Sequence, residues 1–220
     1  MPNWCNNSVE IYHDDPAMIE RVRTAFNDGR FLDEFIPVPQ ALRDTVSGSM
    51  GEDKRAEHEA QQAANVEKHG YANWYDFCVN EWGTKWDVGG DNPAQDFPGG
   101  LMLGFDSAWA PPTTAYEKLT EQGFRIRAMY YEPGMAFAGV WDNGDDDYYE
   151  YGSMDSKEIA ETLPVELDEA FGISESAAEY EAENAEEENI DIDLDGGVSA
   201  VNEQDDGTLA WWVNKQEKQK

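Results

Sequence analysis

A group of aromatic and acidic residues in this sequence carries the side chains that a small-molecule pocket needs. Trp109 stands where an expected strand meets a helix, and Glu132 stands beside an expected hairpin turn. If these strand ends converge, Asp106 and Glu132 would supply two carboxylates for acid–base chemistry. No Ser-His-Asp or Cys-His combination has a recognisable context, so no catalytic residue is assigned. The candidate pocket residues are Trp82, Lys85, Trp86, Asp106, Trp109, Tyr131 and Glu132.

The segment WGTKWDV, residues 82–88, contains two tryptophans four residues apart. In a strand, Trp82 and Trp86 would lie on the same face, which predicts a stripe of the core. A phosphate-binding P-loop is excluded, because Lys85 follows a threonine and the glycine pair comes after it. Two other interpretations are a platform that stacks on a small ligand and a platform that stacks on nucleic-acid bases. The second is disfavoured, because no basic groove accompanies the tryptophans. The spacing of Lys85 and Asp87 is typical of a surface pair.

A helix expected over residues 174–189 carries a stripe of glutamates. Four of them, from Glu175 to Glu187, are spaced four residues apart and therefore share one helix face. Its seven Glu residues give one charge per about 3.4 Å of helix, the phosphate spacing along one strand of B-DNA. A folded acidic surface and a loose acidic tail both remain open. The candidate acidic surface comprises Asp145, Asp146, Asp147, Glu175, Glu179, Glu183, Glu186, Glu187, Asp191, Asp193 and Asp195.

The segment NIDIDLDGG, residues 189–197, has two interpretations. Asp191, Asp193 and Asp195 match the first ligand positions of an EF-hand loop. The twelfth position falls on Asn202, so the bidentate glutamate of that loop is missing. We therefore favour a strand with its Ile and Leu side chains inward, and weak binding of a divalent cation is the alternative.

The net charge of −32 is concentrated in one part of the chain. Residues 142–206 contain 24 acidic residues and 1 basic residue, whereas residues 1–141 contain 22 and 11. Direct binding of nucleic acid through its phosphates is therefore excluded, because it requires a basic face. The expected partner is a basic protein.

The cysteines and the apolar segments favour a cytoplasmic protein. Cys5 and Cys78 form neither a C-x-x-C pair nor ligand spacing with the histidines, so we expect reduced thiols, no metal and no cofactor. Apolar runs fall far short of the roughly 20 residues of a membrane-spanning helix. The start MPNWCNNS lacks a basic segment followed by an apolar one, so no targeting signal is expected.

The elements that position these residues predict an α+β domain over residues 1–152. Their order is strand, helix, strand, strand, helix, strand, which is typical of a ferredoxin-like antiparallel sheet with helices on one face. A helical insertion is expected at about 53–81, and an acidic extension over 153–220 with two short helices, the acidic helix and a possible short hairpin. The expected local signals are an Asp15 helix cap, an Asn73 helix cap, a Thr114–Glu117 capping box, a turn at Asn143–Gly144, and helix starts near Asp155 and Thr162.

Five motifs follow one another over most of residues 1–140. They are MPNWCNN at the start, FIPVP at 35–39, WY at 74–75 with WGTKWD at 82–87, FDSAWAPP at 105–112, and YEPGMAFAG at 131–139. In this order the chain resembles the YubB-like ferredoxin-like family of bacteriophages and conjugative plasmids. The resemblance implies a ferredoxin-like fold in an accessory protein of a mobile element, and it implies no established reaction. No catalytic residue is carried over from it.

The leading hypothesis is a non-enzymatic accessory protein. Its acidic surface would imitate the phosphates of DNA and bind a basic, DNA-binding host protein, in a counter-defence or anti-restriction role. The alternative is an enzyme or small-ligand binder that uses a pocket near Trp109 and Glu132.

Overall fold

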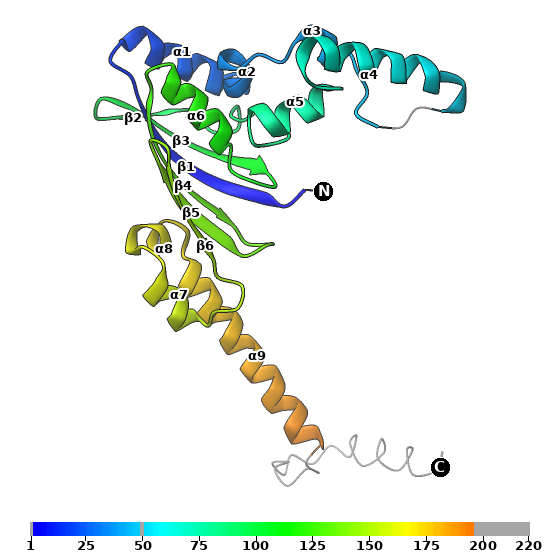
Figure 1. Cartoon of the computed structure of the whole chain (residues 1–220). Coiled ribbons are helices and arrows are strands. Elements are labelled where there is room, and N and C mark those ends of the chain that lie inside the picture. Colours follow the sequence, from blue (N-terminus) through cyan, green and yellow to red (C-terminus); the bar gives the residue numbers. More distant parts are fainter. Residues whose placement is uncertain (1, 49–50, 196–220) are drawn as a thin grey trace. The chain divides into compact units, whose positions relative to one another are not determined.

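An open antiparallel sheet of six strands forms the centre of this α+β protein in the computed structural model (Figure 1). The structure describes residues 2–48 and 51–195, with side chains through residue 185. The strands lie in the order β2-β3-β1-β4-β5-β6. Their bounds are β1 (Trp4–Tyr12), β2 (Gln95–Phe97), β3 (Gly100–Ala108), β4 (Arg125–Glu132), β5 (Phe137–Asp142) and β6 (Asp145–Glu150). The helices are α1 (Pro16–Asn27), α2 (Phe31–Phe35), α3 (Gln40–Arg43), the 3-10 turn η1 (Glu52–Lys54), α4 (Arg55–His69), α5 (Trp74–Glu81), α6 (Thr113–Glu121), α7 (Ser156–Thr162), α8 (Val165–Phe171) and α9 (Ile173–Asp195).

The chain consists of two compact units, Met1–Ser174 and Glu175–Lys220. The first unit contains the sheet together with α1 to α8, and the second contains α9 from Glu175 onward. The domain boundary expected after residue 152 stays a prediction.

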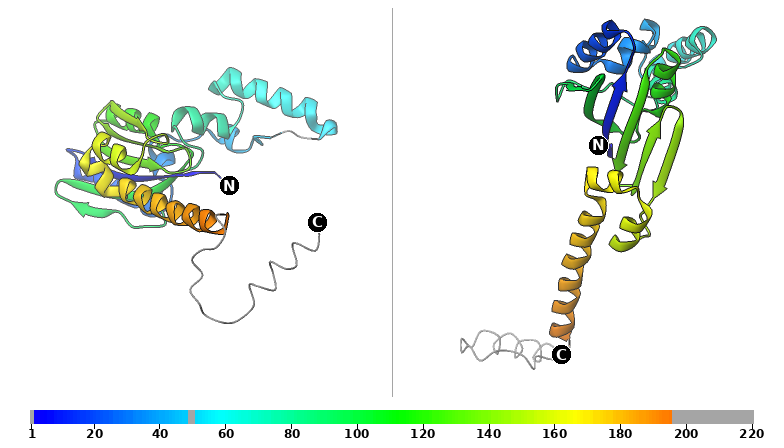
Figure 2. Two further views of the ribbon diagram at one scale, coloured as in Figure 1. Left: turned by 90° about the horizontal axis from the view of Figure 1, so that it is seen from below. Right: turned by 90° about the vertical axis from the view of Figure 1, so that its left-hand side faces the viewer.

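The core lies between one face of the sheet and the helices α1 and α6 (Figures 1 and 2). Val9 in β1 is paired with Leu103 in β3 on one side and with Ala128 in β4 on the other, and all three are fully buried. Phe26 of α1 and Leu119 of α6 belong to the same apolar cluster. Because side chains alternate along a strand, burial of every second residue makes one continuous apolar face. Each fully buried aliphatic side chain stabilises the fold by about 1.5–3 kcal/mol.

Helix α8, which belongs to the extension expected over residues 153–220, packs on the face of the sheet opposite to α1 and α6. Arg127 and Tyr131 alternate along β4 with the buried core residues and therefore point away from the core. Arg127 forms an ion pair with Glu166, and the Tyr131 ring stacks on Phe171 at a centroid distance of 5.6 Å. Helices therefore cover part of both faces.

Four of the expected local signals are confirmed. The Asp15 carboxylate accepts a hydrogen bond from the Ala17 N–H at the start of α1, and the Asn73 side chain accepts one at the start of α5. Asp155 and Glu158 form a capping box at α7. Asn143 and Gly144 both have positive φ, at 48° and 111°, as a two-residue hairpin turn between β5 and β6 requires.

Two expected elements of the first unit are wrong. The segment 82–88 is a loop rather than a strand, because Gly83 adopts a left-handed φ of 85° directly after α5. On the side away from β1, β3 pairs instead with the short strand β2. The Thr114–Glu117 capping box is also absent from the described helix α6, whose N-cap is Pro112, so that Thr114 lies inside the first turn.

The strand expected from Ile190 to Asp195 is also wrong, since α9 is helical through Asp195. No glycine or proline interrupts the sequence between Ile173 and Asp195, so nothing breaks the helix before Gly196. The EF-hand alignment fails for the same reason, because its first ligand positions would need a loop where the backbone is helical. The rest of the possible hairpin lies outside the described residues.

Candidate functional site

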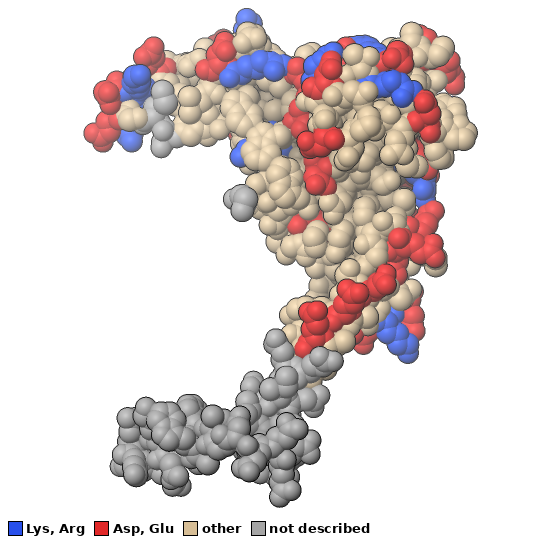
Figure 3. Space-filling view, turned by 180° about the vertical axis from the view of Figure 1, so that it is seen from behind, with Lys and Arg blue, Asp and Glu red and all other residues tan. Residues whose placement is uncertain are grey.

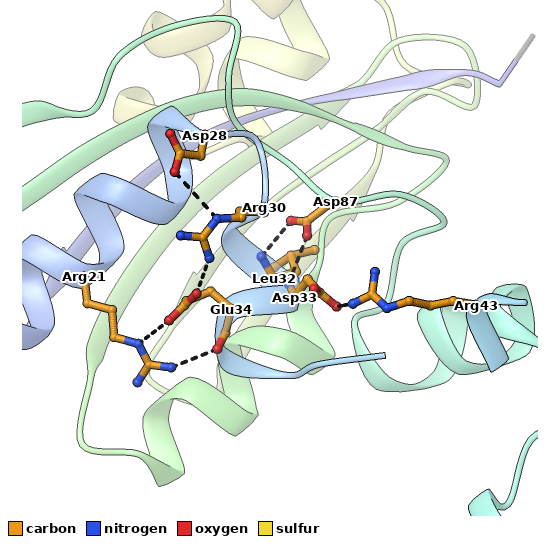
Figure 4. A network of polar contacts seen from close by, with 8 residues as sticks. All are labelled: Arg21, Asp28, Arg30, Leu32, Asp33, Glu34, Arg43 and Asp87. Atoms are coloured by element: carbon orange, nitrogen blue, oxygen red, sulfur yellow. Dashed lines mark hydrogen bonds and ion pairs between the residues drawn. The ribbon is translucent and has the colours of Figure 1, made fainter. Parts of the chain in front are cut away.

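The loop that follows α5 is held in place by the partly buried carboxylate of Asp87. Its Oδ1 accepts a hydrogen bond from the Leu32 N–H at 2.7 Å, and its Oδ2 accepts one from the Asp33 N–H at 2.9 Å (Figure 4). The Val88 N–H also donates to Oδ1, at 2.8 Å. Burial raises the pKa of Asp87, and these three N–H donors oppose that rise. Asp87 thus fastens the loop to the N-terminus of α2, while Arg43 forms an ion pair with the neighbouring Asp33.

The two tryptophans of this loop lie in different environments, which corrects the expectation of a shared core stripe. Trp82 is buried, and its indole N–H donates to the carbonyl oxygen of Ile36 at 2.9 Å. Trp86 is 39% exposed, and its ring centroid lies 5.9 Å from that of Trp4. The Lys85 ammonium lies 4.5 Å from the Trp86 ring centroid, in the position of a cation–π pair.

Two hollows adjoin the Trp86 ring. The first, with a volume of about 160 Å³, is named here the Trp4–Trp86 hollow. Its lining includes Trp4, Trp86, Gly104 and three acidic residues, Asp87, Asp91 and Asp106. The second hollow has a volume of about 320 Å³ and is more open, and it is lined in part by Trp74, Trp82, Lys85 and Arg43. Both hollows lie in the first compact unit.

The structure brings only some of the expected pocket residues together. Trp82, Lys85 and Trp86 line the second hollow, and Trp86 and Asp106 line the first. Among the described residues, neither lining includes the other three members of the set, which are Trp109, Tyr131 and Glu132.

Each of those three residues has a distinct local setting. Glu132 is buried, and its carboxylate accepts N–H hydrogen bonds from Gly134 and Met135 in the β4–β5 turn. Tyr131 stacks between Tyr151 and Phe171. Trp109 is 50% exposed and has a φ of 74°, which is unusual for a residue with a bulky side chain.

The two carboxylates considered for acid–base chemistry point to opposite faces of the sheet. Asn6 in β1 is paired with Asp106 on one side and with Tyr131 on the other, so these three side chains share a face. Glu132 follows Tyr131 and therefore points to the core face. The arrangement does not bring Asp106 and Glu132 onto one substrate.

Sequence reasoning missed Trp4, Asp91 and Gly104 as parts of a hollow. Trp4 begins a strand whose buried positions include the polar Asn7, so the alternation of polar and apolar residues did not reveal β1 before Ser8. Asp91 approaches β3 only through the loop that Asp87 fastens. A tryptophan among the polar residues of the start MPNWCNN was the signal available in the sequence.

The acidic surface expected from the sequence includes two described regions. Asp145, Asp146 and Asp147 are exposed on the edge strand β6, where the Tyr130 hydroxyl donates to Asp146 Oδ1 at 2.7 Å. Burial, followed by this bond, raises the pKa of Tyr130.

Glu175, Glu179 and Glu183 are exposed along α9, and Figure 3 shows acidic side chains following that helix as a stripe. For the remaining members of the surface the structure describes only the backbone, which lies in α9. These are Glu186, Glu187, Asp191, Asp193 and Asp195.

Two kinds of feature are absent from the described residues. Within the ranges 2–48 and 51–195, no helix is long and apolar enough to cross a membrane. Over the same part of the chain, no group of three or more His, Cys, Asp or Glu side chains has the arrangement of a metal site.

Comparison with known proteins gives one structural similarity. No family model and no curated protein matches the chain. Among solved structures, the chain is similar to the crystal structure of the protein api92 from Yersinia pseudotuberculosis, which is described with the family model DUF1281. The sequence identity is 15%, the alignment covers 70% of this chain and 99% of the other, and the TM-score is 0.37. A similarity at this level carries no argument about function.

Proposed function

We propose that this chain is a non-enzymatic accessory protein of a phage or plasmid. Its acidic surface, centred on α9, engages a basic, DNA-binding host protein by imitating the charge spacing of DNA. The ferredoxin-like assignment and the YubB-like relationship belong to this proposal. The order β2-β3-β1-β4 with α1 and α6 on one face supports the former, and the five sequence motifs support the latter.

The charge density of α9 is the observation that carries the proposal. Its 23 residues include ten Asp and Glu and no Lys or Arg. At a rise of 1.5 Å per residue the helix is about 34 Å long, so one acidic residue occurs per about 3.4 Å. The phosphates along one strand of B-DNA have the same axial spacing.

The arrangement of these charges opposes helix stability. Glu175, Glu179 and Glu183 follow one another at a spacing of four, and like charges at that spacing destabilise a helix by about 0.2–0.5 kcal/mol per pair. No basic residue within α9 offsets that repulsion. A pattern that weakens its own helix favours a role in binding, where a basic partner neutralises the charge.

Competition with DNA tests this function. The full-length chain is added to host DNA-binding proteins held on immobilised double-stranded DNA at 0.15 M salt, and released proteins are identified by mass spectrometry. The chain is expected to release basic DNA-binding proteins. A variant with Glu175, Glu179, Glu183 and Glu187 replaced by Gln is expected to need about tenfold more protein for the same release, because four exposed charge pairs together contribute about 1.4 kcal/mol.

The matched control changes the same net charge elsewhere. It replaces Glu52, Glu57, Glu59 and Glu67 by Gln, in and next to α4, and it should release the same proteins as the unaltered chain. Equal losses in the two variants would show an effect of bulk charge and contradict the proposal. The absence of any released DNA-binding protein would contradict it as well.

A further inference from the structure

We propose that the Trp4–Trp86 hollow is a binding site for an organic cation, such as a guanidinium or alkylammonium group. The hollow lies in the unit Met1–Ser174, away from the charges of α9 in the sequence, and this inference does not depend on the proposed function. It rests on the aromatic walls, the lining carboxylates and the preformed shape of the hollow.

Two tryptophans, Trp4 and Trp86, line the hollow. The rings of Trp4 and Trp86 are tilted by 37° at a centroid distance of 5.9 Å, so they do not stack face to face. Both remain partly open, with 46% of Trp4 and 39% of Trp86 exposed. The face of an indole attracts a cation more strongly than any other aromatic side chain does. The Lys85 ammonium lies 4.5 Å from the Trp86 ring centroid, and Lys85 lines the second hollow.

The charged lining of the hollow has a single sign. Asp87, Asp91 and Asp106 line it, and its described lining contains neither Lys nor Arg. Asp106 is exposed, and its Oδ1 is positioned by a hydrogen bond of 2.5 Å from the Asn6 side chain. Asp91 is exposed as well, whereas Asp87 is committed to three backbone N–H groups. The field of these carboxylates favours cations and repels phosphates and carboxylates.

The shape of the hollow exists before any ligand binds. A Cβ atom at Gly104 would meet no atom within 4 Å, so the missing side chain leaves open space on β3. A Cβ atom at Gly89 would lie 2.2 Å from the carbonyl oxygen of Phe26, so the opposite loop is packed directly against the end of α1. The volume of about 160 Å³ suits the end of one side chain and excludes a nucleotide.

A pair of nearly identical ligands tests the proposal on the full-length chain. Acetyl-arginine amide is titrated by calorimetry and by the indole N–H resonances of the tryptophans. Acetyl-citrulline amide, its uncharged counterpart with the same shape, is the control. The arginine compound is expected to bind at least tenfold more tightly and to shift the Trp4 and Trp86 resonances. Equal binding of the two compounds, or no binding of the arginine compound, would overturn the proposal.

Three variants place the binding in this hollow. Asp106→Asn and Trp4→Ala should each weaken the arginine compound about tenfold, and Gly104→Leu should abolish binding by filling the open space. Asp142→Asn is the matched control, because Asp142 is also exposed and its Oδ1 also accepts a hydrogen bond from an asparagine side chain, at 2.7 Å. The thermal midpoint of each variant is measured alongside. Equal losses for Asp106→Asn and Asp142→Asn, or unchanged binding by Gly104→Leu with an unchanged midpoint, would contradict the site.

Discussion

Several acidic side chains in the unit Met1–Ser174 bind backbone N–H groups or arginines, whereas those of α9 are arranged along a helix whose sequence contains no Lys or Arg. Asp87 accepts three backbone N–H groups, Glu132 accepts two, and Glu34 binds two arginines. In α9 the glutamates repeat at a spacing of four with no Lys or Arg between them. The difference teaches that the role of a carboxylate depends on the N–H groups and cations that lie next to it in the fold. The first unit has such donors, and α9 must find its cations elsewhere.

The largest expected contrast between the two regions concerns apolar packing. Leu103 is fully buried at the centre of the sheet, so Leu103→Ala should lower the free energy of unfolding by about 3 kcal/mol through lost burial and the cavity left behind. Tyr180 in α9 is 68% exposed, so Tyr180→Ala should change the free energy of unfolding by less than about 0.5 kcal/mol. Urea unfolding followed by circular dichroism measures both. If Leu103→Ala lowered the free energy of unfolding by less than 1 kcal/mol, the expected difference between the two regions would be contradicted.

A smaller contrast concerns the same chemical change made in each region. Asp87→Ala leaves three N–H groups without their acceptor and should destabilise the protein by about 2 kcal/mol. Glu179→Ala removes like-charge repulsion and introduces the best helix former, so it should leave stability unchanged or raise it by about 0.5 kcal/mol. The urea unfolding midpoints of the two variants measure this difference in stability. Similar destabilisation by both would show that α9 also depends on its carboxylates.

The smallest expected difference between the two regions concerns how stability depends on pH. Hydrogen bonds from Arg21, and then from Arg30, hold the pKa of Glu34 below its usual value. Because the folded pKa lies below the unfolded value of about 4.3, this stabilisation is complete above about pH 5 and is lost as the pH falls through the folded pKa.

Glu34→Gln should therefore be less stable than the unaltered protein by less than about 1 kcal/mol at pH 7. The difference should shrink as the pH falls below about 5 and vanish once the pH lies below the folded pKa. Urea unfolding of the two proteins across this pH range measures it. A Glu34→Gln difference that does not shrink on acidification would exclude the arginine contacts as its cause.

Signals that act over a few residues predicted the structure well. Asp15 and Pro16 at the start of α1, and Asn143 and Gly144 between β5 and β6, need only their own neighbours to define a cap or a turn. The α+β class and the hairpin of β4 and β5 followed from alternation along the strands. These features were predictable because the physics that forms them is local.

Features that depend on distant partners were missed or misassigned. The residues Trp82 to Val88 alternate like a strand, but Asp87 bonds to backbone groups 54 and 55 residues earlier in the chain and thereby defines a loop. The Trp4–Trp86 hollow requires that loop to lie against β3, and no spacing within either segment indicates it. Ile190 to Asp195 alternates as well, but α9 continues through it because nothing in that segment stops a helix.

The two glycines that line the Trp4–Trp86 hollow differ in how well they tolerate substitution. Any side chain at Gly89 would collide with the backbone of Phe26, so that wall can change only if the fold changes with it. Gly104 lies on a strand with no atom near its missing Cβ, so many residues can replace it without strain. A single nucleotide change at that codon can therefore narrow or close the hollow while the protein still folds. Ligand preference at this end of the sheet can diverge between related chains faster than the scaffold that carries it.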